Sequence, residues 1–218
     1  MKNRFDLIIF DWDGTLIDSI DWIAKCLQHA GELCGCGLAD YQAAKAVIGL
    51  SIDNAMQVLF PEQDNGVIER LIVHYNHAYC SRDMGKDDLF PGVYDMLLAL
   101  RDQGFTLAVA TGKTRAGLDR VLDNTGTRHL FAITRCADET ASKPDPKMLH
   151  EIMAHVGVPQ QRTLMVGDSI HDLEMAFNAD ITAIAVACGA HPEAELQQHG
   201  PLHCLQLPTQ LLDLIENG

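Results

Sequence analysis

The chain lacks the features that place a protein at a membrane or on nucleic acid. No apolar run is long enough to span a bilayer, and no charged segment followed by an apolar one opens the sequence as a signal peptide would. Positive charge is scarce, because 16 lysines and arginines stand against 30 aspartates and glutamates. The resulting net charge of −14 repels nucleic acid and anionic lipid. We therefore expect a cytoplasmic protein with neither nucleic acid nor a membrane as its partner.

A disulfide framework is missing as well. The seven cysteines are an odd number and include no Cys-x-x-Cys pair. Cys34 and Cys36 form one close pair, but alternate spacing is strained for a disulfide and poor for zinc. The cysteines therefore predict reduced, mostly buried thiols, as in cytosolic proteins.

Apolar residues, in contrast, are plentiful. They make up 47% of the 218 residues, which excludes a disordered chain. A chain of this length can bury one ample core, or a core together with a small insert.

The stretch from Phe5 to Asp18 organises the rest of the sequence. Its apolar run, residues 7–10, predicts a strand that is buried on both faces, and Asp11 and Asp13 follow on alternate positions. Clustered buried carboxylates repel each other and lose hydration, so a compensating cation is expected, and Mg²⁺ prefers such oxygen ligands. Taken alone, Asp-x-Asp-Gly-Thr could also be an ordinary turn.

Residues 17–85 show helical periodicity and no convincing strand. This block therefore predicts an all-helical insert, bounded at its far end by the polar residues 81–88. The expected helices are 18–33, with Asp18 or Ser19 as N-cap, 40–60, with a break at 49–51, and 67–79.

Strands and helices alternate from Phe90 onward. Alternation implies parallel pairing with right-handed crossovers, so the fold class is α/β, with an open parallel Rossmann-like sheet. The expected strands are 106–110, 131–134, 163–166, 182–186 and a weak 203–207. The expected helices are 93–101 with Pro91 in its first turn, 115–124, 146–156, 170–178, 193–199 and one from Pro208.

Polar residues follow three of the predicted strands where each one ends. Asp11 and Asp13 end the first, Thr111 ends the second along the core, and Asp168 ends the strand at 163–166. Ligands of open α/β sheets bind beyond the carboxyl ends of the strands. A chance turn motif would not produce this convergence.

Further candidates lie close to these strand ends. The hydroxyl of Thr111 and the amide of Gly112 can donate to an anionic oxygen, although Thr111 could instead cap the next helix. Lys143 stands just ahead of a helix, where a solvated lysine is the alternative. Asp172, one turn after Asp168, could orient the other acids. Asp168 or Ser169 could also serve as an N-cap.

Taken in order, the segments DWDGT, ATGK, SKPDP and GDSIHD resemble the four motifs of the haloacid dehalogenase-like hydrolase superfamily. The helical block resembles the small cap domain of its phosphoglycolate phosphatase and β-phosphoglucomutase-like branch. The resemblance covers nearly the whole chain. It implies an α/β catalytic core at 1–16 and 86–218, with a helical cap domain at 17–85 inserted after the first strand.

The resemblance also implies roles for individual residues. Asp11 would be the nucleophile that forms an aspartyl-phosphate, and Asp13 the general acid and then base. Phosphoryl transfer depends mainly on charge neutralisation and alignment. Thr111, Gly112 and Lys143 would hold the phosphoryl oxygens, and Asp11, the backbone carbonyl of Asp13, and Asp168 would ligate Mg²⁺ with Asp172 in support.

The implied function is a Mg²⁺-dependent phosphatase acting on a small phosphorylated metabolite, such as a phosphoglycolate- or sugar-phosphate-like monoester. Lys45 and Ser51 lie where caps of this type lower residues over the active site, and they are possible substrate contacts. The protein would be a monomer or a small homo-oligomer.

Three other functions remain as alternatives. A β-phosphoglucomutase-like phosphomutase would use the same residues but return the phosphoryl group to a sugar. A haloacid dehalogenase would also use Asp11, but it attacks carbon and needs neither Asp13 nor a metal. A phospho-accepting signalling module combines clustered acids, a threonine and a lysine, but it is about half as long and has no cap.

Two segments depart from the family pattern. Asp180 stands where relatives often have a glycine at a helix end, and an aspartate can adopt the left-handed conformation at modest cost. Residues 187–191 lack the aromatic residue that many relatives carry there, which weakens any transfer of substrate preference.

Overall fold

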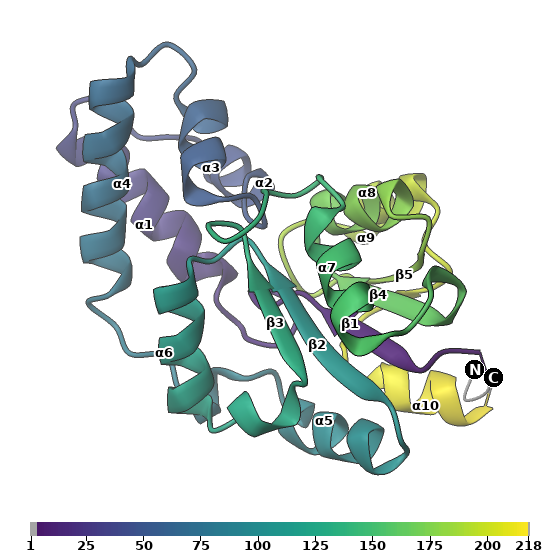
Figure 1. Ribbon diagram of the computed structural model, residues 1–218. Coiled ribbons are helices and arrows are strands. Elements are labelled where there is room, and N and C mark those ends of the chain that lie inside the picture. The colour runs from purple at the N-terminus through teal and green to yellow at the C-terminus, as the bar shows by residue number, and fades with distance from the viewer. Residues whose placement is uncertain (1–3, 218) are drawn as a thin grey trace.

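The protein is built on an open sheet of six parallel strands in the order β3-β2-β1-β4-β5-β6 (Figure 1). The computed structural model describes residues 4–217. The predicted fold class is confirmed, and the strands at 7–10 and 182–186 have the predicted bounds, whereas β3 begins two residues later than predicted. The strands are β1 Leu7–Phe10, β2 Thr106–Thr111, β3 Ile133–Cys136, β4 Thr163–Gly167, β5 Thr182–Val186 and β6 Cys204–Leu205.

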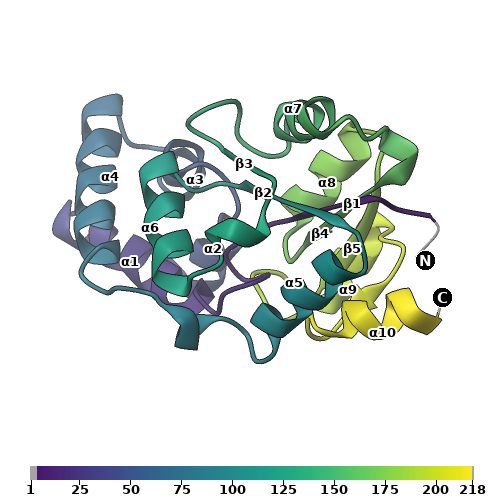
Figure 2. The same ribbon diagram turned by 60° about the horizontal axis from the view of Figure 1, so that its bottom comes forward.

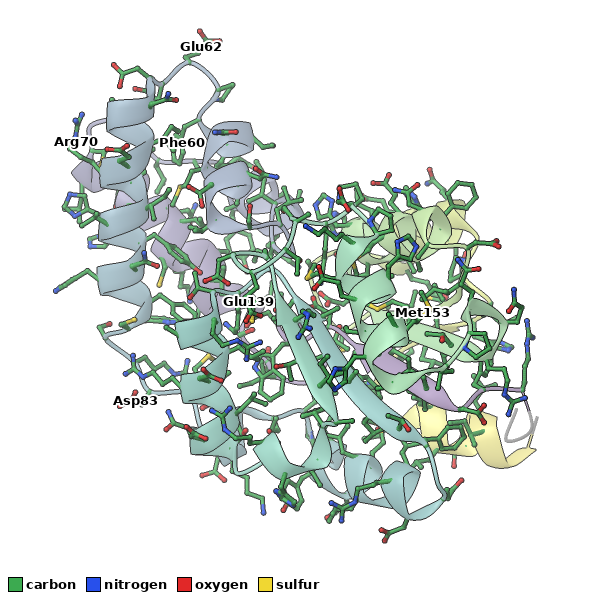
Figure 3. The ribbon with its side chains drawn as sticks, viewed as in Figure 1. Phe60, Glu62, Arg70, Asp83, Glu139 and Met153 are labelled. Carbon is green, nitrogen blue, oxygen red and sulfur yellow. The ribbon has the colours of Figure 1, made fainter. Side chains whose placement is uncertain are left out.

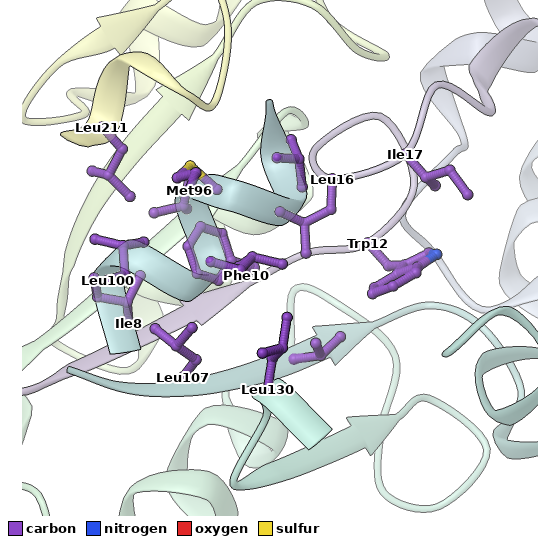
Figure 4. Packing of buried hydrophobic residues seen from close by; sticks show 14 of the residues in the cluster. Ile8, Phe10, Trp12, Leu16, Ile17, Met96, Leu100, Leu107, Leu130 and Leu211 are labelled. Atoms are coloured by element: carbon purple, nitrogen blue, oxygen red, sulfur yellow. The ribbon is translucent and has the colours of Figure 1, made fainter. Parts of the chain in front are cut away.

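The central strand β1 is apolar on both faces because helices cover both faces of the sheet. Ile8 and Phe10 pack on one side, in the same cluster as Met96 and Leu100 of α5 and Leu211 of α10 (Figure 4). Leu7 and Ile9 pack on the other side, against α7 and α8. The core helices are α5 Val93–Asp102, α6 Arg115–Thr125, α7 Lys147–Val156, α8 Ile170–Asn178, α9 Glu193–Leu196 and α10 Gln210–Asn217, with 3₁₀ turns at 86–88, 128–130, 160–162 and 197–199.

Helix ends in the core follow local chemistry, with one correction. Gly126 and Gly157 end α6 and α7 in the left-handed conformation. Pro91 does not open α5 as predicted, because the N-cap is Gly92 with φ of 81°, which places the proline outside the helix. Asp180 has φ of 55°, which confirms the expected left-handed position after α8.

The four helices that follow β1, α1 to α4, form a helical cap that stands beside the sheet, and α5 then returns the chain to the core (Figures 1 and 2). Within the described part of residues 17–85 there is no strand, as predicted. The exact boundary at residues 17 and 85 stays a prediction. The cap helices are α1 Ile20–Leu33, α2 Tyr41–Ala46, α3 Ile52–Leu59 and α4 Asn65–Tyr79.

The cap has an apolar cluster of its own. Leu27, Ala30, Met56 and Leu71 are buried in it, and α1 packs along α4. Figure 3 shows Phe60, which belongs to this cap cluster, far from Met153 of the core cluster on α7. The apolar clusters of the cap and of the core therefore lie in separate parts of the molecule.

No helix in the described range 4–217 combines the length and the apolar character that a bilayer crossing requires. All seven cysteines are free thiols, as expected. The expectation that they are mostly buried is wrong, because only Cys26 and Cys136 are buried. Cys34, Cys36 and Cys80 instead end the cap helices α1 and α4, where turns leave them partly open to solvent.

Candidate active site

Three carboxylates meet at the carboxyl edge of the sheet. Asp11 directly follows β1, Asp168 directly follows β4, and Asp172 lies in the first turn of α8. Because β1 and β4 are hydrogen-bonded neighbours at the point where the strand order reverses, their ends lie side by side. All three residues are buried, and one oxygen from each lies within 4.8 Å of the others. The sheet topology therefore brings together acids that are 161 positions apart, from 11 to 172.

Lys143 lies among these acids. Its side chain is only 1% exposed, which excludes the solvated lysine considered above. The ammonium Nζ lies 2.7 Å from Oδ1 of Asp11 and 2.6 Å from Oδ1 of Asp172. Burial lowers the pKa of Lys143, but these two carboxylates raise it by more, so the pKa is higher than that of an ordinary lysine. Lys143 is therefore a fixed positive charge in the site.

Asp168 is held by two donors. The Thr15 hydroxyl donates to Oδ1 at 2.7 Å and the Ala190 amide donates to Oδ2 at 2.7 Å. Gly14, with φ of 75°, leaves room for this carboxylate, since a Cβ there would collide with it. Burial, together with the charge of Asp172, raises the pKa of Asp168 to about 7 despite the two donors.

The charges in the site favour a bound cation. Three carboxylates face the single ammonium of Lys143. Burial raises the pKa of Asp11 well above its usual range, and the nearby Asp172 and Asp168 add to that increase while Lys143 opposes it. Buried oxygen ligands that are short of positive charge fit a hard divalent ion. The acidic triad Asp11, Asp168 and Asp172 thus could hold a metal.

Asp172 has a second task. Ser169 is the N-cap of α8 and forms a capping box, in which the Asp172 amide donates to the Ser169 hydroxyl oxygen at 3.3 Å and the Ser169 amide donates to Oδ2 of Asp172 at 3.1 Å. The Ser169 hydroxyl also donates to Oδ2 of Asp172 at 2.6 Å. The predicted N-cap role of Ser169 is confirmed. The capping box fixes Asp172 so that its other oxygen, Oδ1, faces Lys143.

Asp13 turns its carboxylate to a different set of partners. The Ser19 hydroxyl donates to Oδ1 at 2.6 Å, and Nζ of Lys113 lies 2.9 Å from Oδ2. Lys113 also donates to the hydroxyl of Tyr79, the last residue of α4, at 2.6 Å. Ser19 is the N-cap of α1, as one of the two predicted candidates, but its side chain makes no capping bond because its hydroxyl binds Asp13.

Sequence reasoning gave Lys113 no role. The residue was visible in the ATGK segment, but nothing in the sequence shows that its side chain reaches Asp13. Burial lowers the pKa of Lys113, while Asp13, Tyr79 and Tyr75 raise it by more, so this lysine too stays charged. The structure thus pairs one lysine with each of the two acids, Lys143 with Asp11 and Lys113 with Asp13.

Thr111 and Gly112 lie at the end of β2, beside the same site. Thr111 is buried, and the N-cap of α6 is Thr114, so the alternative that Thr111 caps the next helix is wrong. Gly112 lies directly beneath the cap, and a Cβ there would collide with the backbone carbonyl oxygens of Gly49 and Leu50. Only a glycine lets the cap backbone approach this closely.

The cap contacts the core at two further points. The amide of Ser51 donates to the hydroxyl of Ser142 at 2.8 Å, and Nε2 of His171 lies 3.0 Å from the carbonyl oxygen of Ala46. Ser51 itself is the N-cap of α3. Lys45 is half-buried at the end of α2.

A cavity of about 440 Å³ lies between cap and core. Asp11, Asp13, Thr111, Gly112 and Lys113 line its core side, and residues of α1, α3 and α4 line the other. Among the described residues, the lining of this cavity includes neither Lys45 nor Ser51. Contact of these two residues with a substrate stays a prediction.

Comparison with known proteins supports the geometry. The family model described as haloacid dehalogenase-like hydrolase matches residues 8–186. The chain is 34% identical to the probable phosphatase IndB of Dickeya dadantii over 89% of this chain and 86% of that protein. It is 33% identical to the phosphoglycolate phosphatase of Agrobacterium fabrum over 84% of this chain and 81% of that protein.

A solved structure shares the whole fold. A hydrolase from Pseudomonas syringae superimposes with a TM-score of 0.87 at 23% identity, covering 98% of both chains. The sheet and the inserted cap are thus a fold that this chain shares with that protein. The chain belongs to the haloacid dehalogenase-like hydrolase family and is a phosphatase of its phosphoglycolate phosphatase-like branch.

Proposed function

We propose that the protein is a Mg²⁺-dependent phosphatase that hydrolyses a small phosphate monoester through an aspartyl-phosphate on Asp11. The observation that carries this proposal is the position of Asp11. Its carboxylate lies in the cavity wall, with Lys143 on one oxygen and Asp168 and Asp172 close by. A buried carboxylate that is held in place by a fixed cation is suited to attack phosphorus in line.

The phosphoryl oxygens would be bound by groups on the core side of the cavity. Thr111 and the Gly112 amide lie at the end of β2, next to the strand that carries Asp11. Lys143 is already aimed at the Asp11 carboxylate, so its charge reaches both the nucleophile and the group transferred to it. These residues neutralise charge on the equatorial oxygens during transfer.

Asp13 would transfer protons. It would give a proton to the departing alcohol and then accept one from the water that attacks the aspartyl-phosphate. The Ser19 hydroxyl and the Lys113 ammonium each hold one oxygen of this carboxylate. They orient Asp13 away from the acidic triad and into the cavity, where the leaving group would lie.

The proposed ligands of Mg²⁺ are Asp11, the backbone carbonyl of Asp13, and Asp168, with Asp172 in support. When bound, this ion supplies positive charge to the transferring phosphoryl group. The burial and mutual repulsion of the three carboxylates are what a divalent ion would relieve.

The test is a phosphate-release assay with purified protein, Mg²⁺ and a panel of phosphorylated metabolites that includes phosphoglycolate and hexose phosphates. We expect release of inorganic phosphate, loss of activity with EDTA, and recovery when Mg²⁺ is restored. Isomerisation of a hexose phosphate without phosphate release would instead identify a phosphomutase. If activity survives thorough chelation, the metal assignment is wrong, and if no ester is turned over, the proposed function is wrong.

A further inference from the structure

The wall of the active-site cavity is divided by polarity. Its buried members outside the phosphoryl site are apolar, and they come from α1, from the segment around the 47–50 turn, from α3, from the segment after α4 and from α6. They are Ile23, Leu27, Val47, Ile48, Ala55, Met84 and Val121. Four lining residues with polar or charged ends, Asn76, Arg82, Arg120 and Asn124, are exposed and form the mouth, whereas Tyr75, Tyr79 and Lys113 are only partly exposed.

An apolar cavity of this size needs an occupant. Protein interiors are close-packed, and voids larger than a water molecule are few. The cavity measures about 440 Å³ and includes Asp11 and Asp13 in its wall, so it is continuous with the phosphoryl site. Pockets of a few hundred Å³ enclose most of a ligand's surface. A phosphate group together with two or three polar atoms would leave most of the apolar wall uncovered.

The charges in the wall disfavour a substrate with a second anionic group. Among the described residues that line the cavity, each basic side chain already has an acidic partner. Lys113 pairs with Asp13, Arg82 with Asp88, and Arg120 with Asp83. Asp83 lies on the segment that returns from the cap to the core (Figure 3). A carboxylate such as that of phosphoglycolate would have to share a cation with one of these partners.

One wall of the cavity is aromatic. The rings of Tyr75 and Tyr79 stack with centroids 5.7 Å apart, and both residues line the cavity. Burial raises the pKa of both phenols, so they stay neutral. Stacked neutral rings add flat apolar surface next to the aliphatic side chains of α1 and α3.

We infer that the substrate is the phosphate monoester of an apolar alcohol, whose hydrocarbon part fills this cavity while Asp11 and Asp13 act on its phosphate. The inference rests on the proposed phosphatase function and narrows its substrate class. It predicts selection by hydrocarbon length and against added polar or anionic groups.

The test is a series of n-alkyl phosphates: ethyl, butyl and hexyl. Their alcohols have nearly the same leaving-group acidity, so differences in kcat/KM report binding of the chain. We expect kcat/KM to rise by about fourfold for each added methylene, or by roughly 250-fold over the four methylenes from ethyl to hexyl. Phosphoglycolate and glycerol phosphate should be poorer than butyl phosphate by about tenfold or more.

Variants of one cap helix locate the effect. Ile52 is half-buried and lines the cavity, whereas Val58 on the same helix is 62% exposed and points away from it. Ile52→Gln should lower the ratio of hexyl to ethyl kcat/KM by about fivefold or more, and Val58→Gln should leave the ratio unchanged. Leu50→Gln, at another half-buried lining position, replaces Ile52→Gln if that variant does not fold.

The results of these assays distinguish failure of the apolar-substrate inference from failure of the proposed phosphatase function. A series that is flat or falls with chain length, while ethyl or p-nitrophenyl phosphate is still hydrolysed, overturns the inference and leaves the phosphatase intact. A hexyl-to-ethyl ratio that both cavity variants leave unchanged also overturns the inference. No hydrolysis of any ester overturns the proposed function, and the inference with it.

Discussion

The two catalytic acids are held in two different ways. Asp11 belongs to a core half of the site, formed with Lys143, Asp168 and Asp172, and every member comes from the α/β core. Asp13 belongs to a seam half, formed with Ser19, Lys113 and Tyr79, where the cap joins the core.

The difference lies in what each half depends on. The core half is set by neighbouring strand ends and by the capping box of α8, all of which belong to the core. In the seam half, Ser19 begins the first cap helix and Tyr79 ends the last, so both chain crossings between cap and core are tied to Asp13. The proposed nucleophile, Asp11, is therefore positioned by the core alone, whereas the proposed acid–base group, Asp13, also takes its position from contacts with the cap.

The largest expected effect comes from breaking the core half at Asp11. Asp11→Asn should lower kcat by at least about 10⁴-fold, because an amide cannot form the acyl-phosphate. The fold should survive, since the change removes one of three crowded carboxylates. Phosphate release and thermal unfolding of the same preparation check both expectations, and substantial residual turnover would rule Asp11 out as nucleophile.

The core half should also make stability depend on pH when no metal is present. The pKa of Asp168 rises from 3.8 to about 7 in the folded protein. Between these values the folded state binds more protons than the unfolded state, so the free energy of unfolding falls as pH rises from about 4 to about 7. The expected loss is roughly a few kcal/mol, measured by urea denaturation in EDTA.

Two experiments test whether this loss of stability comes from the core half. Mg²⁺ should restore stability at neutral pH, because it binds the ionised carboxylates of the folded state. Asp168→Asn should flatten the dependence, whereas Asp53→Asn, at an exposed position on α3, should not. A slope that persists in Asp168→Asn would place its origin elsewhere.

The seam half can be broken at Lys113. Lys113→Met removes the cation on Asp13 and should lower kcat by about 10- to 100-fold, less than the loss of the nucleophile. Lys147→Met, at an exposed lysine of α7, is the control. If Lys113→Met retains the kcat of this control, Lys113 is not needed to hold Asp13.

The smallest expected effect tests whether the cap positions Asp13 at all. Tyr79→Phe removes only the hydroxyl that accepts from Lys113 and should lower kcat by about two- to tenfold, the worth of one hydrogen bond. Tyr75→Phe is the matched control, because the hydrogen bond of Lys113 goes to Tyr79. If Tyr79→Phe and Tyr75→Phe have equal kcat values, the position of the cap does not influence Asp13.

The same division separates what the sequence predicted from what it did not. The core strands, the helical insert and the convergence of Asp11, Asp168 and Asp172 follow from periodicity and from the geometry of parallel sheets. The partners of Asp13 do not, because they depend on how one domain lies against the other. Local rules also failed where a tertiary contact replaced them, as at Ser19, whose hydroxyl binds Asp13 instead of capping α1.

Residues 46–51 of the cap contact the core through backbone atoms. The carbonyls of Gly49 and Leu50 lie over Gly112, the carbonyl of Ala46 meets His171, and the amide of Ser51 meets Ser142. Since a carbonyl or an amide is present whatever the side chain, Leu50 and Ala46 can be exchanged without losing these contacts. The contacts of this segment with the core are thus made by backbone atoms and the cavity wall by side chains, so side chains that line the cavity can be exchanged while these contacts are kept.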